Sequence, residues 1–363
     1  MGKKIYRILV INPGSTSTKL AYYENEKEIF SETIRHSTEE LNQFTRICDQ
    51  FCFRHRSIAS FLKERNIDIS KLDTIVARGG LTMPVPGGTY LVNEAMLEHL
   101  RKCVMGAHAS NLGAILAHEL AKSHGIPCYI VDPVVVDEME EIARLSGLKA
   151  LPRKSIFHAL NHKAVARKVA KEIGGKYEDF NFIVAHMGGG ISIGIHKKGR
   201  VVDVNNALDG EGPFTPERSG TLPVGDLVRE CFSGRYTLEY VLKKIKGKGG
   251  IVDYLGTNNM KKVSDEVKKG NKEWQLIYEA MAYQVAKCIG AMATVVNGEV
   301  DRIILTGGIA YDEMFVNWII NRVKFIAPVV VYPGEEEMRA LMEGALRVLK
   351  GEERPKIYGY FWR

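Results

Sequence analysis

A polar cluster follows the first apolar run of the chain. Residues 5–11, IYRILVI, are mostly β-branched or apolar and are typical of a buried strand. The next residues read NPGSTSTK, in which Asn12 precedes a turn and Ser15, Ser17 and Lys19 alternate along a second strand. Because alternate side chains share one face of a strand, these hydroxyls and the ammonium group are expected to face a common ligand. Phosphate, or the metal that accompanies it, is the chemistry that such groups suit.

Glycine turns are predicted at the ends of four strands. Glycine lets backbone amides approach a phosphate because no Cβ is in the way. The sequence contains neither G-x-x-x-x-G-K-[ST] nor a G-x-G-x-x-G that opens a helix, so the P-loop and Rossmann modes of nucleotide binding are not supported. The glycines of the four turns are Gly14, Gly79 and Gly80, Gly188, Gly189 and Gly190, and Gly307 and Gly308.

The bulk composition argues against nucleic-acid and membrane proteins. The formal charge of +7 is spread along the chain, and its densest run, KKIKGKG from Lys243, has no interleaved aromatic residue for base stacking. A modest positive charge suits small anions such as nucleotides and carboxylates. The most apolar long segment, 281–296, contains Gln284 and Lys287 and predicts a buried helix rather than a membrane span. With no recognisable targeting segment, we expect a cytoplasmic protein.

The predicted strands and helices occur as a repeated pattern. Three strand-like runs within 5–35 are followed by alternating helices and strands, and three more runs within 181–207 start the pattern again. Asn12 and His186 lie at equivalent places, about 174 residues apart. This duplication resembles the paired ribonuclease-H-like domains of sugar kinases, actin and Hsp70. We therefore expect an α/β protein of two such domains with mixed sheets and an active-site cleft between them.

An ordered series of motifs resembles those of acetate and butyrate kinases. NPGSTSTK resembles the first phosphate motif of these enzymes, and DPVVVDEM resembles butyrate kinases in particular. The series covers nearly the whole chain. The other segments are ARGG at Arg78, GAHASN at His108, IVDP at Asp132, IFHALNH at His158, HMGGGIS at His186, PERSG at Arg218, TGGIA at Gly307 and PGEEEM at Glu336.

The resemblance implies a reversible, Mg²⁺-dependent transfer of the γ-phosphoryl group of ATP to a short carboxylate. Arg78 then meets the carboxylate, and Arg218 and His158 stabilise the phosphoryl group, while His108 lies in a further active-site segment. Guanidinium groups suit both anions because they bind carboxylate or phosphate through two N–H groups and stay charged. Asp132 is expected to order magnesium-bound waters or an arginine, the alternative being that it only ends a strand before Pro133.

The resemblance also implies the binding residues and the assembly. Asn12 and Glu336 are the expected magnesium residues, with the register among Glu335, Glu336 and Glu337 left open. The first domain is expected at 1–150 and the second, nucleotide-binding domain at 151–363, with the closing helix as a candidate to pack back on the first. A homodimer or larger homo-oligomer is expected. The residues expected to bind ATP or ADP are Ser15, Ser17, Lys19, His186, Gly188, Gly189, Gly190, Asn259, Gly307 and Gly308.

Two small residues suggest the length of the substrate. Acetate kinases carry bulkier apolar residues where this sequence has Gly80 and Ala107, so a larger pocket for butyrate or isobutyrate is predicted. Tight packing around these residues is the alternative. An acetate or propionate kinase, and an ATP-gated switch protein of the Hsp70 or actin type, are the alternative functions. The switch protein would have no need for a carboxylate substrate.

Overall fold

The structure is a computed structural model that describes residues 4–359, which form two compact units. The first unit contains the residues up to 136 and those from 336 onward, and the second contains 137–335. The first boundary therefore lies before the expected residue 150. Two contacts explain this: Glu138 forms a buried ion pair with Lys163 at 2.8 Å, and the backbone N–H of Glu140 donates to the carbonyl of Val202. Both contacts tie 137–140 to the second unit.

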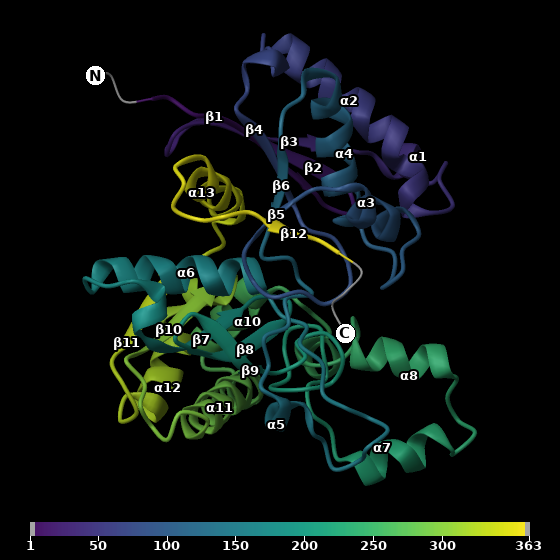
Figure 1. Cartoon of the computed structure of the whole chain (residues 1–363). Helices are drawn as coiled ribbons and strands as arrows, with labels where there is room; N and C mark the ends of the chain where they lie inside the picture. The colour runs from purple at the N-terminus through teal and green to yellow at the C-terminus, as the bar shows by residue number, and fades with distance from the viewer. Residues whose placement is uncertain (1–3, 360–363) are drawn as a thin grey trace. The chain divides into compact units, whose positions relative to one another are not determined.

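The first unit is built on a seven-stranded mixed sheet in the order β12-β5-β6-β4-β1-β2-β3 (Figure 1). Strands β1, β2 and β3 form an antiparallel meander, and β4 and β6 extend it with parallel pairing on the other side of β1. The strands are β1 (Arg7–Pro13), β2 (Ser17–Glu24), β3 (Lys27–Arg35), β4 (Thr74–Arg78), β5 (Thr89–Leu91), β6 (Cys128–Val131) and β12 (Lys356–Ile357).

The second unit repeats this core in a five-stranded sheet of order β11-β10-β7-β8-β9. Strands β7, β8 and β9 are the antiparallel meander, and β10 and β11 are added in parallel. The duplicated α/β fold with mixed sheets is thereby confirmed. The strands are β7 (Asn181–Met187), β8 (Ile191–Lys197), β9 (Arg200–Val204), β10 (Arg302–Gly307) and β11 (Val329–Pro333).

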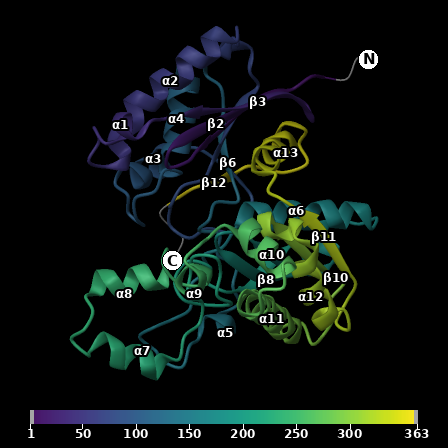
Figure 2. The same cartoon turned by 180° about the vertical axis from the view of Figure 1, so that it is seen from behind.

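Helices cover both faces of the first sheet. In Figure 2 the helices α1 to α4 lie on one side of the strands and α13 lies on the other. The closing helix α13 packs on β1, β4 and β6, so it belongs to the first unit, as its apolar face requires. These helices are α1 (Thr38–Leu41), α2 (Phe51–Glu64), α3 (Glu94–Arg101), α4 (Asn111–Ala121) and α13 (Glu337–Leu349).

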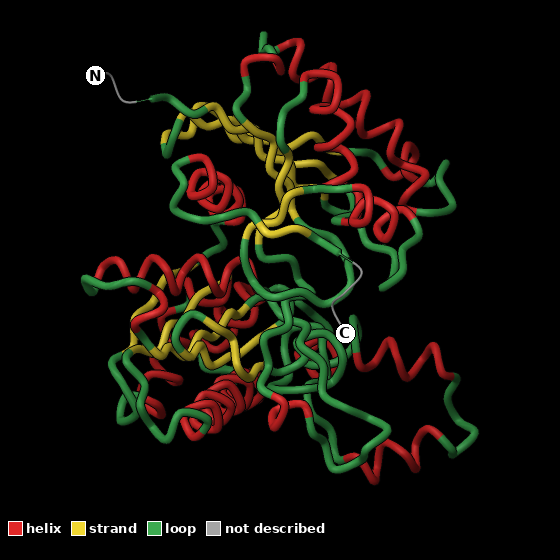
Figure 3. The backbone as a smooth tube through the Cα atoms, in the orientation of Figure 1, coloured by secondary structure: helices red, strands yellow, loops and turns green. Residues whose placement is uncertain are grey.

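The second sheet is likewise packed on both faces (Figure 3). Helix α6 packs against Phe182 and Val184 of β7, whereas α11 and α12 pack against Ile183 and Ala185 on the opposite face. No helix within 4–359 is long and apolar enough to cross a membrane. The helices are α5 (Glu141–Arg144), α6 (Ala159–Glu172), α7 (Val224–Cys231), α8 (Leu238–Ile245), α9 (Ile251–Leu255), α10 (Met260–Lys268), α11 (Lys272–Thr294) and α12 (Glu313–Val323).

Candidate active site

The turn between β1 and β2 presents its polar residues as the alternation predicts. Ser15 and Lys19 are exposed and Ser17 is half-buried, whereas Thr18 is buried on the other face of β2. Asn12, at the end of β1, is also buried. Thr16, expected on the other face, is exposed as well, so the turn offers three hydroxyls and a cation to solvent, and hence to an anionic ligand.

Arg54 of α2 holds this turn through hydrogen bonds to its backbone. This role was not predicted from the sequence. Its side chain is fully buried, and its guanidinium donates to the carbonyl oxygens of Ser15 (2.9 Å) and Ser17 (2.8 Å) and to the Thr18 hydroxyl (3.1 Å). The remaining donors bind Gln50. The signal in the sequence is periodicity, since Arg54 falls on the α2 face that otherwise buries Ile58 and Leu62.

Glu337 is the acidic residue beside Asn12, among the three glutamates whose register the sequence left open. The Nδ2 of Asn12 donates to Oε2 of Glu337 at 2.7 Å, and Arg78 approaches both carboxylate oxygens, at 2.8 and 3.0 Å. Glu336 is exposed, with its charge near Tyr23 and Arg339. The first turn of α13 points the side chain of Glu337, and not that of its neighbour, at the ends of β1 and β4.

His108 lies close enough to Arg78 to feel its charge. Loss of water around the ring, followed by the positive charge of Arg78, lowers the pKa of His108 from its usual 6.5. The backbone N–H of Ser110 points at Nδ1 from 3.2 Å, and the Ser110 hydroxyl lies 2.8 Å from the same atom. A neutral ring that accepts at Nδ1 carries its proton on Nε2, so His108 is set to donate from Nε2.

Gly80 is enclosed by packing and does not open a substrate pocket. A Cβ on Gly80 would lie 2.6 Å from the Cα of Asn111 and 2.8 Å from a methyl group of Leu100. The Oδ1 of Asn111 also accepts from the backbone N–H of Leu81, which fixes the start of α4 against this strand end. The enlarged-pocket prediction is therefore wrong for Gly80. Ala107 is exposed in the loop before α4.

Asp132 is buried at the end of β6 in a backbone conformation that is unusual for a residue other than glycine. Its φ is +37°, and its carboxylate accepts from the backbone N–H of Gly88 at 2.7 Å. The N–H of Asp132 in turn donates to the carbonyl of Gly88. The carboxylate thus holds the 88–89 segment at the sheet, and a strained residue at a strand end is a common feature of functional sites.

In the second unit, His158 and His186 stack on each other. Their ring centroids lie 4.0 Å apart, and Nδ1 of His158 lies 2.8 Å from the hydroxyl of Ser192. His186 is buried at the end of β7, with Nε2 3.0 Å from Oε1 of Glu335, an ion pair only when the ring is protonated. This contact meets the distance of an ion pair but not the geometry of a hydrogen bond, so within residues 4–359 neither ring nitrogen of His186 has a hydrogen-bond partner. Two imidazoles are therefore held together beside the glycine turn that follows β7.

Arg218 packs directly on this glycine turn. A Cβ on Gly190 would collide with the guanidinium of Arg218, so the close approach depends on glycine at that position. The guanidinium also donates to the carbonyl of Ala207, and the Thr215 hydroxyl donates to the carbonyl of Gly189 at 2.7 Å. Burial lowers the pKa of Arg218 from 12.5. The guanidinium group and the glycine turn, in which Gly189 is exposed, thus lie against each other.

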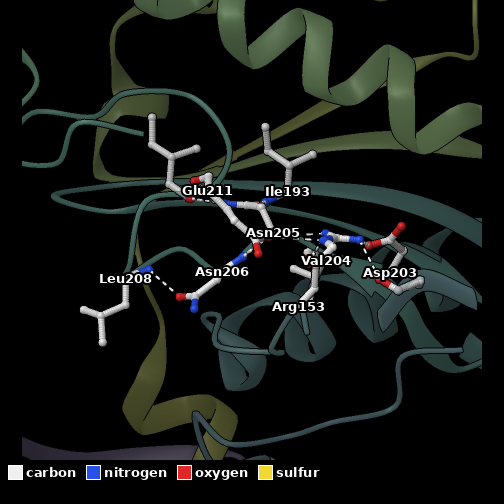
Figure 4. Close-up of polar contacts among 10 residues, drawn as sticks. Arg153, Ile193, Asp203, Val204, Asn205, Asn206, Leu208 and Glu211 are labelled. Carbon is white, nitrogen blue, oxygen red and sulfur yellow. Dashed lines mark hydrogen bonds and ion pairs between the residues drawn. The ribbon is translucent and has the colours of Figure 1, made fainter. Parts of the chain in front are cut away.

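The loop that carries Arg218 is anchored by Arg153 (Figure 4). Arg153 donates to Asp203 at 2.9 Å and to the carbonyl of Val204 at 3.0 Å, and it lies within 3.4 Å of Glu211. The side chain of Asn205 accepts from the backbone N–H of Ile193 and donates to the carbonyl of Glu211. This network was not predicted from the sequence. It fixes the start of the loop that carries Arg218 to β8 and β9.

The other expected nucleotide residues differ in what they do. Gly307 has a φ of +90°, and a Cβ there would overlap the backbone of Met187, so this position requires glycine. Gly308 is exposed, with open space where a side chain would be. The Oδ1 of Asn259 accepts from the N–H of Lys262 at 3.1 Å and caps α10. The side chain of Asn259 therefore stabilises the start of α10.

Comparison with known proteins places these features in a family. The family model described as "Acetokinase family" matches residues 130–330. Butyrate kinase 1 of Clostridium acetobutylicum is 61% identical over 98% of this chain and 100% of its own length. The chain belongs to the acetokinase family. Butyrate kinase 2 of the same organism is 59% identical over 97% of this chain and 99% of its own length, in agreement with the resemblance drawn from the motifs.

Solved structures of an acetate kinase and a propionate kinase share the fold. The acetate kinase of Porphyromonas gingivalis superposes with a TM-score of 0.79 over 95% of this chain and all of its own, at 18% identity. A propionate kinase from Francisella tularensis gives a TM-score of 0.72 over 93% of this chain and 98% of its own, at 19% identity. At such low identity these matches establish the arrangement of strands and helices alone.

Proposed function

We propose that the protein is a butyrate kinase that transfers the γ-phosphoryl group of ATP to butyrate and catalyses the reverse reaction. The observation that carries the proposal is the 61% identity to butyrate kinase 1 over 98% of the chain. In the forward direction a carboxylate oxygen bonds to the γ-phosphorus, and the bond from that phosphorus to the β,γ-bridging oxygen breaks to release ADP. Nucleophile and leaving group are both anionic oxygens, so no proton has to move.

The first unit supplies groups suited to the acid. Arg78 is partly exposed and binds one carboxylate already, that of Glu337, with the planar fork that suits a second carboxylate. His108, neutral and protonated on Nε2, adds a hydrogen-bond donor without adding charge. Ser15, Ser17 and Lys19 provide further donors for phosphate oxygens. Asp132 acts through the backbone that it holds, as a positioning residue.

The second unit supplies groups suited to the nucleotide phosphates. Gly189 is the exposed residue of the turn, and no side chain of its own covers its backbone, which can therefore approach a phosphate oxygen. Arg218 lies against this turn and carries a charge that can compensate the equatorial oxygens in the transition state. His158 donates a hydrogen bond to the transferring group. Gly307 and Gly308 form the second glycine turn for the nucleotide.

Asn12 and Glu337 are the residues proposed to hold Mg²⁺. The fit is chemical: the Glu337 carboxylate and the Asn12 carboxamide oxygen match the oxygen preference of Mg²⁺, which otherwise keeps water and phosphate oxygens. The hydrogen bond from Nδ2 of Asn12 to Oε2 of Glu337, 2.7 Å long, keeps these two side chains together. When bound, Mg²⁺ supplies positive charge to the phosphate oxygens. The side chains themselves orient the site: Asn12 holds Glu337, and Glu337 holds Arg78.

We also propose that the chain forms a homo-oligomer. Helices α7 and α8 bury no residue of their own. Phe232, directly after α7, and Leu238, the first residue of α8, are 87% and 69% exposed. In Figure 1 both helices project from the sheet of the second unit. Apolar side chains of this size gain stability when a second copy covers them. Light scattering on the purified protein and on Phe232→Glu measures this, and a monomer in both cases would contradict it.

The proposed reaction is tested by trapping its product. Purified protein is incubated with Mg-ATP and butyrate, the acyl phosphate is captured with hydroxylamine, and ADP is measured in parallel. We expect equal amounts of hydroxamate and ADP, and loss of both in Arg78→Ala. ADP without hydroxamate would contradict a carboxylate kinase and favour an ATP-gated switch. The control is Arg56→Ala, which removes an exposed arginine of α2.

A further inference from the structure

Five side chains of the second unit form a continuous hydrogen-bonded chain that ends at His158. The hydroxyl of Tyr177 lies 2.6 Å from Nδ1 of His196, and Nε2 of His196 lies 3.2 Å from Nδ1 of His162. From there, Nε2 of His162 lies 2.8 Å from the hydroxyl of Ser192, which lies 2.8 Å from Nδ1 of His158. No other part of the proposed reaction uses Tyr177, His196, His162 or Ser192.

The chain is formed by a helix packed on a strand. His158 precedes α6 and His162 is one turn further along, while Ser192 and His196 are four residues apart on the same face of β8. Tyr177 comes from the short 3₁₀ helix Tyr177–Asp179 that follows α6. The links alternate between the two elements, which is why spacing along the sequence alone did not reveal them.

The interior of the chain is fully enclosed. His162, His196 and Ser192 have no exposed surface, and Tyr177 is only 4% exposed. Burial lowers the pKa of both buried histidines well below 6.5, and the charges of nearby cations lower that of His196 further. Both rings are therefore neutral at pH 7, and each neutral ring has one N–H.

Because each neutral ring has one donor and one acceptor nitrogen, the direction of the first hydrogen bond, between Tyr177 and His196, determines which atom donates at every later link. If Tyr177 donates to Nδ1 of His196, the proton of His196 lies on Nε2 and is donated to His162. His162 must then donate from Nε2 to Ser192, and Ser192 must donate to Nδ1 of His158. His158 is left with its own proton on Nε2.

The opposite direction is less favourable at the link between Tyr177 and His196. It would require an imidazole N–H to donate to a phenol oxygen, although the phenol O–H is the stronger donor and the imidazole nitrogen the stronger acceptor. Hydrogen bonds that point the same way along a chain polarise and strengthen one another, so the preference at this end extends along the chain to His158. The short 2.6 Å contact of Tyr177 with His196 agrees with an O–H donor.

We propose that Tyr177, His196, His162 and Ser192 are positioning residues that hold His158 in the Nε2–H tautomer. The proposal rests on the proposed function in one respect: the Nε2–H of His158 is the donor to the transferring phosphoryl group. Nδ1 of His158 is already engaged by Ser192, so contact with a phosphoryl oxygen is made by Nε2. A bare Nε2 would instead place a lone pair against an anionic oxygen.

This role explains why a chain of imidazoles suits a reaction that transfers no proton. The chain fixes which nitrogen of His158 is a donor before substrates bind, so the hydrogen bond needs no rearrangement during phosphoryl transfer. A positive charge on the buried rings would stabilise the bound nucleotide and the transition state equally, and would therefore not raise kcat. Because the rings stay neutral, they add no such charge.

The tautomer can be read directly by NMR. In protein labelled with ¹⁵N-histidine, a protonated and an unprotonated ring nitrogen have well-separated shifts, and the signals of His158 are those lost in His158→Gln. We expect His158 in ligand-free protein at pH 7.5 to carry its proton on Nε2. In Ser192→Ala and Tyr177→Phe we expect a mixture of tautomers. A wild-type His158 protonated on Nδ1, or tautomers unchanged in both variants, would overturn the proposal.

Kinetics provide the second readout. We expect kcat to fall about tenfold in Tyr177→Phe and Ser192→Ala, in the range typical for outer partners of functional histidines, with KM for ATP and butyrate unchanged. The matched control is Tyr278→Phe, which removes another buried hydroxyl of the second unit, one that donates to Asp312. It is expected to keep kcat. An equal loss in the control, or a change in KM alone, would contradict the proposal.

The two hypotheses fail in different ways. If wild-type protein makes no acyl phosphate while its His158 is protonated on Nε2 and loses that preference in Ser192→Ala, the proposed function fails and the chain of hydrogen bonds stands. If wild-type protein is an active butyrate kinase and the tautomer is insensitive to both variants, the inference fails and the function stands.

Discussion

Three arginines of the candidate site share a guanidinium group but differ in their surroundings. Arg54 is fully buried and donates only to uncharged oxygens, and burial lowers its pKa from 12.5 to about 10. Arg78 binds a carboxylate at the surface, and Arg218 binds a backbone carbonyl beside a glycine turn. With a pKa of about 10, Arg54 remains charged at neutral pH, so it adds positive potential to the turn between β1 and β2 as well as holding its shape.

Replacing Arg54 by Met tests its structural role. The methionine fills a similar volume but leaves the carbonyls of Ser15 and Ser17, the Thr18 hydroxyl and Gln50 without donors, so we expect a loss of about 3 kcal/mol in the free energy of unfolding. Urea unfolding of wild-type protein and Arg54→Met measures the difference. The control is Arg56→Met, from the exposed face of the same helix. Equal stability of the two variants would show that Arg54 is dispensable.

Single substitutions also test which glutamate, Glu336 or Glu337, holds Mg²⁺. If Glu337 holds Mg²⁺ with Asn12, Glu337→Gln should raise the Mg²⁺ concentration for half-maximal activity by about 10- to 100-fold. Glu336→Gln is the matched control, because it makes the same change one residue earlier on an exposed side chain. Titration of activity with Mg²⁺ compares them. A larger effect in Glu336→Gln would restore the register expected from the sequence.

At the scale of the element, the packing of α6 on β8 makes stability depend on pH. His162 and His196 are neutral in the folded state because burial lowers their pKa below 6.5, whereas in the unfolded chain they titrate near 6.5. Below that pH the unfolded state binds more protons, so the free energy of unfolding falls as the pH falls.

We expect a loss of about 1 kcal/mol for each of these two histidines between pH 6 and pH 5. Urea unfolding at both pH values measures it. In His196→Gln one titrating group is removed, so the pH dependence should be shallower, although the variant is less stable overall. His124→Gln, in an exposed turn, is the control and should keep the wild-type slope. An unchanged slope in His196→Gln would contradict neutral burial.

The strand end at Gly80 gives a second prediction at this scale. A Cβ there would overlap the backbone of Asn111, so Gly80→Ala should lower the free energy of unfolding by about 2 kcal/mol and reduce activity with every acid alike. Gly290→Ala in α11 is the control, since its Cβ meets nothing within 4 Å. A shift of preference toward acetate at unchanged stability would instead revive the enlarged-pocket idea.

What the sequence could predict depended on the range of the interaction. Alternation along β2 correctly separated Ser17 and Lys19 from Thr18, because neighbouring side chains of one strand must face opposite ways. The surroundings of Gly80 were misread because Asn111 lies 31 positions away in the chain and its approach is set by tertiary packing. The orientation of Glu337 depends on how α13 begins, which three consecutive glutamates leave undefined.

At the scale of the whole molecule, one fold is used twice with different chemistry. In each unit a meander of three strands begins with a tight turn, after β1 in the first and after β7 in the second. The first turn carries hydroxyls and a lysine, and the second carries three glycines. The two units therefore place different side chains at equivalent turns of the same fold.

We propose that the protein is a carboxylate kinase whose preferred acid is butyrate. This is tested by kcat/KM with Mg-ATP for a series of acids from acetate to hexanoate, with isobutyrate, measured by hydroxamate formation. We expect a maximum at four carbons. A maximum at acetate would contradict the assignment to butyrate, and ATP turnover that is indifferent to every acid would contradict the carboxylate kinase itself.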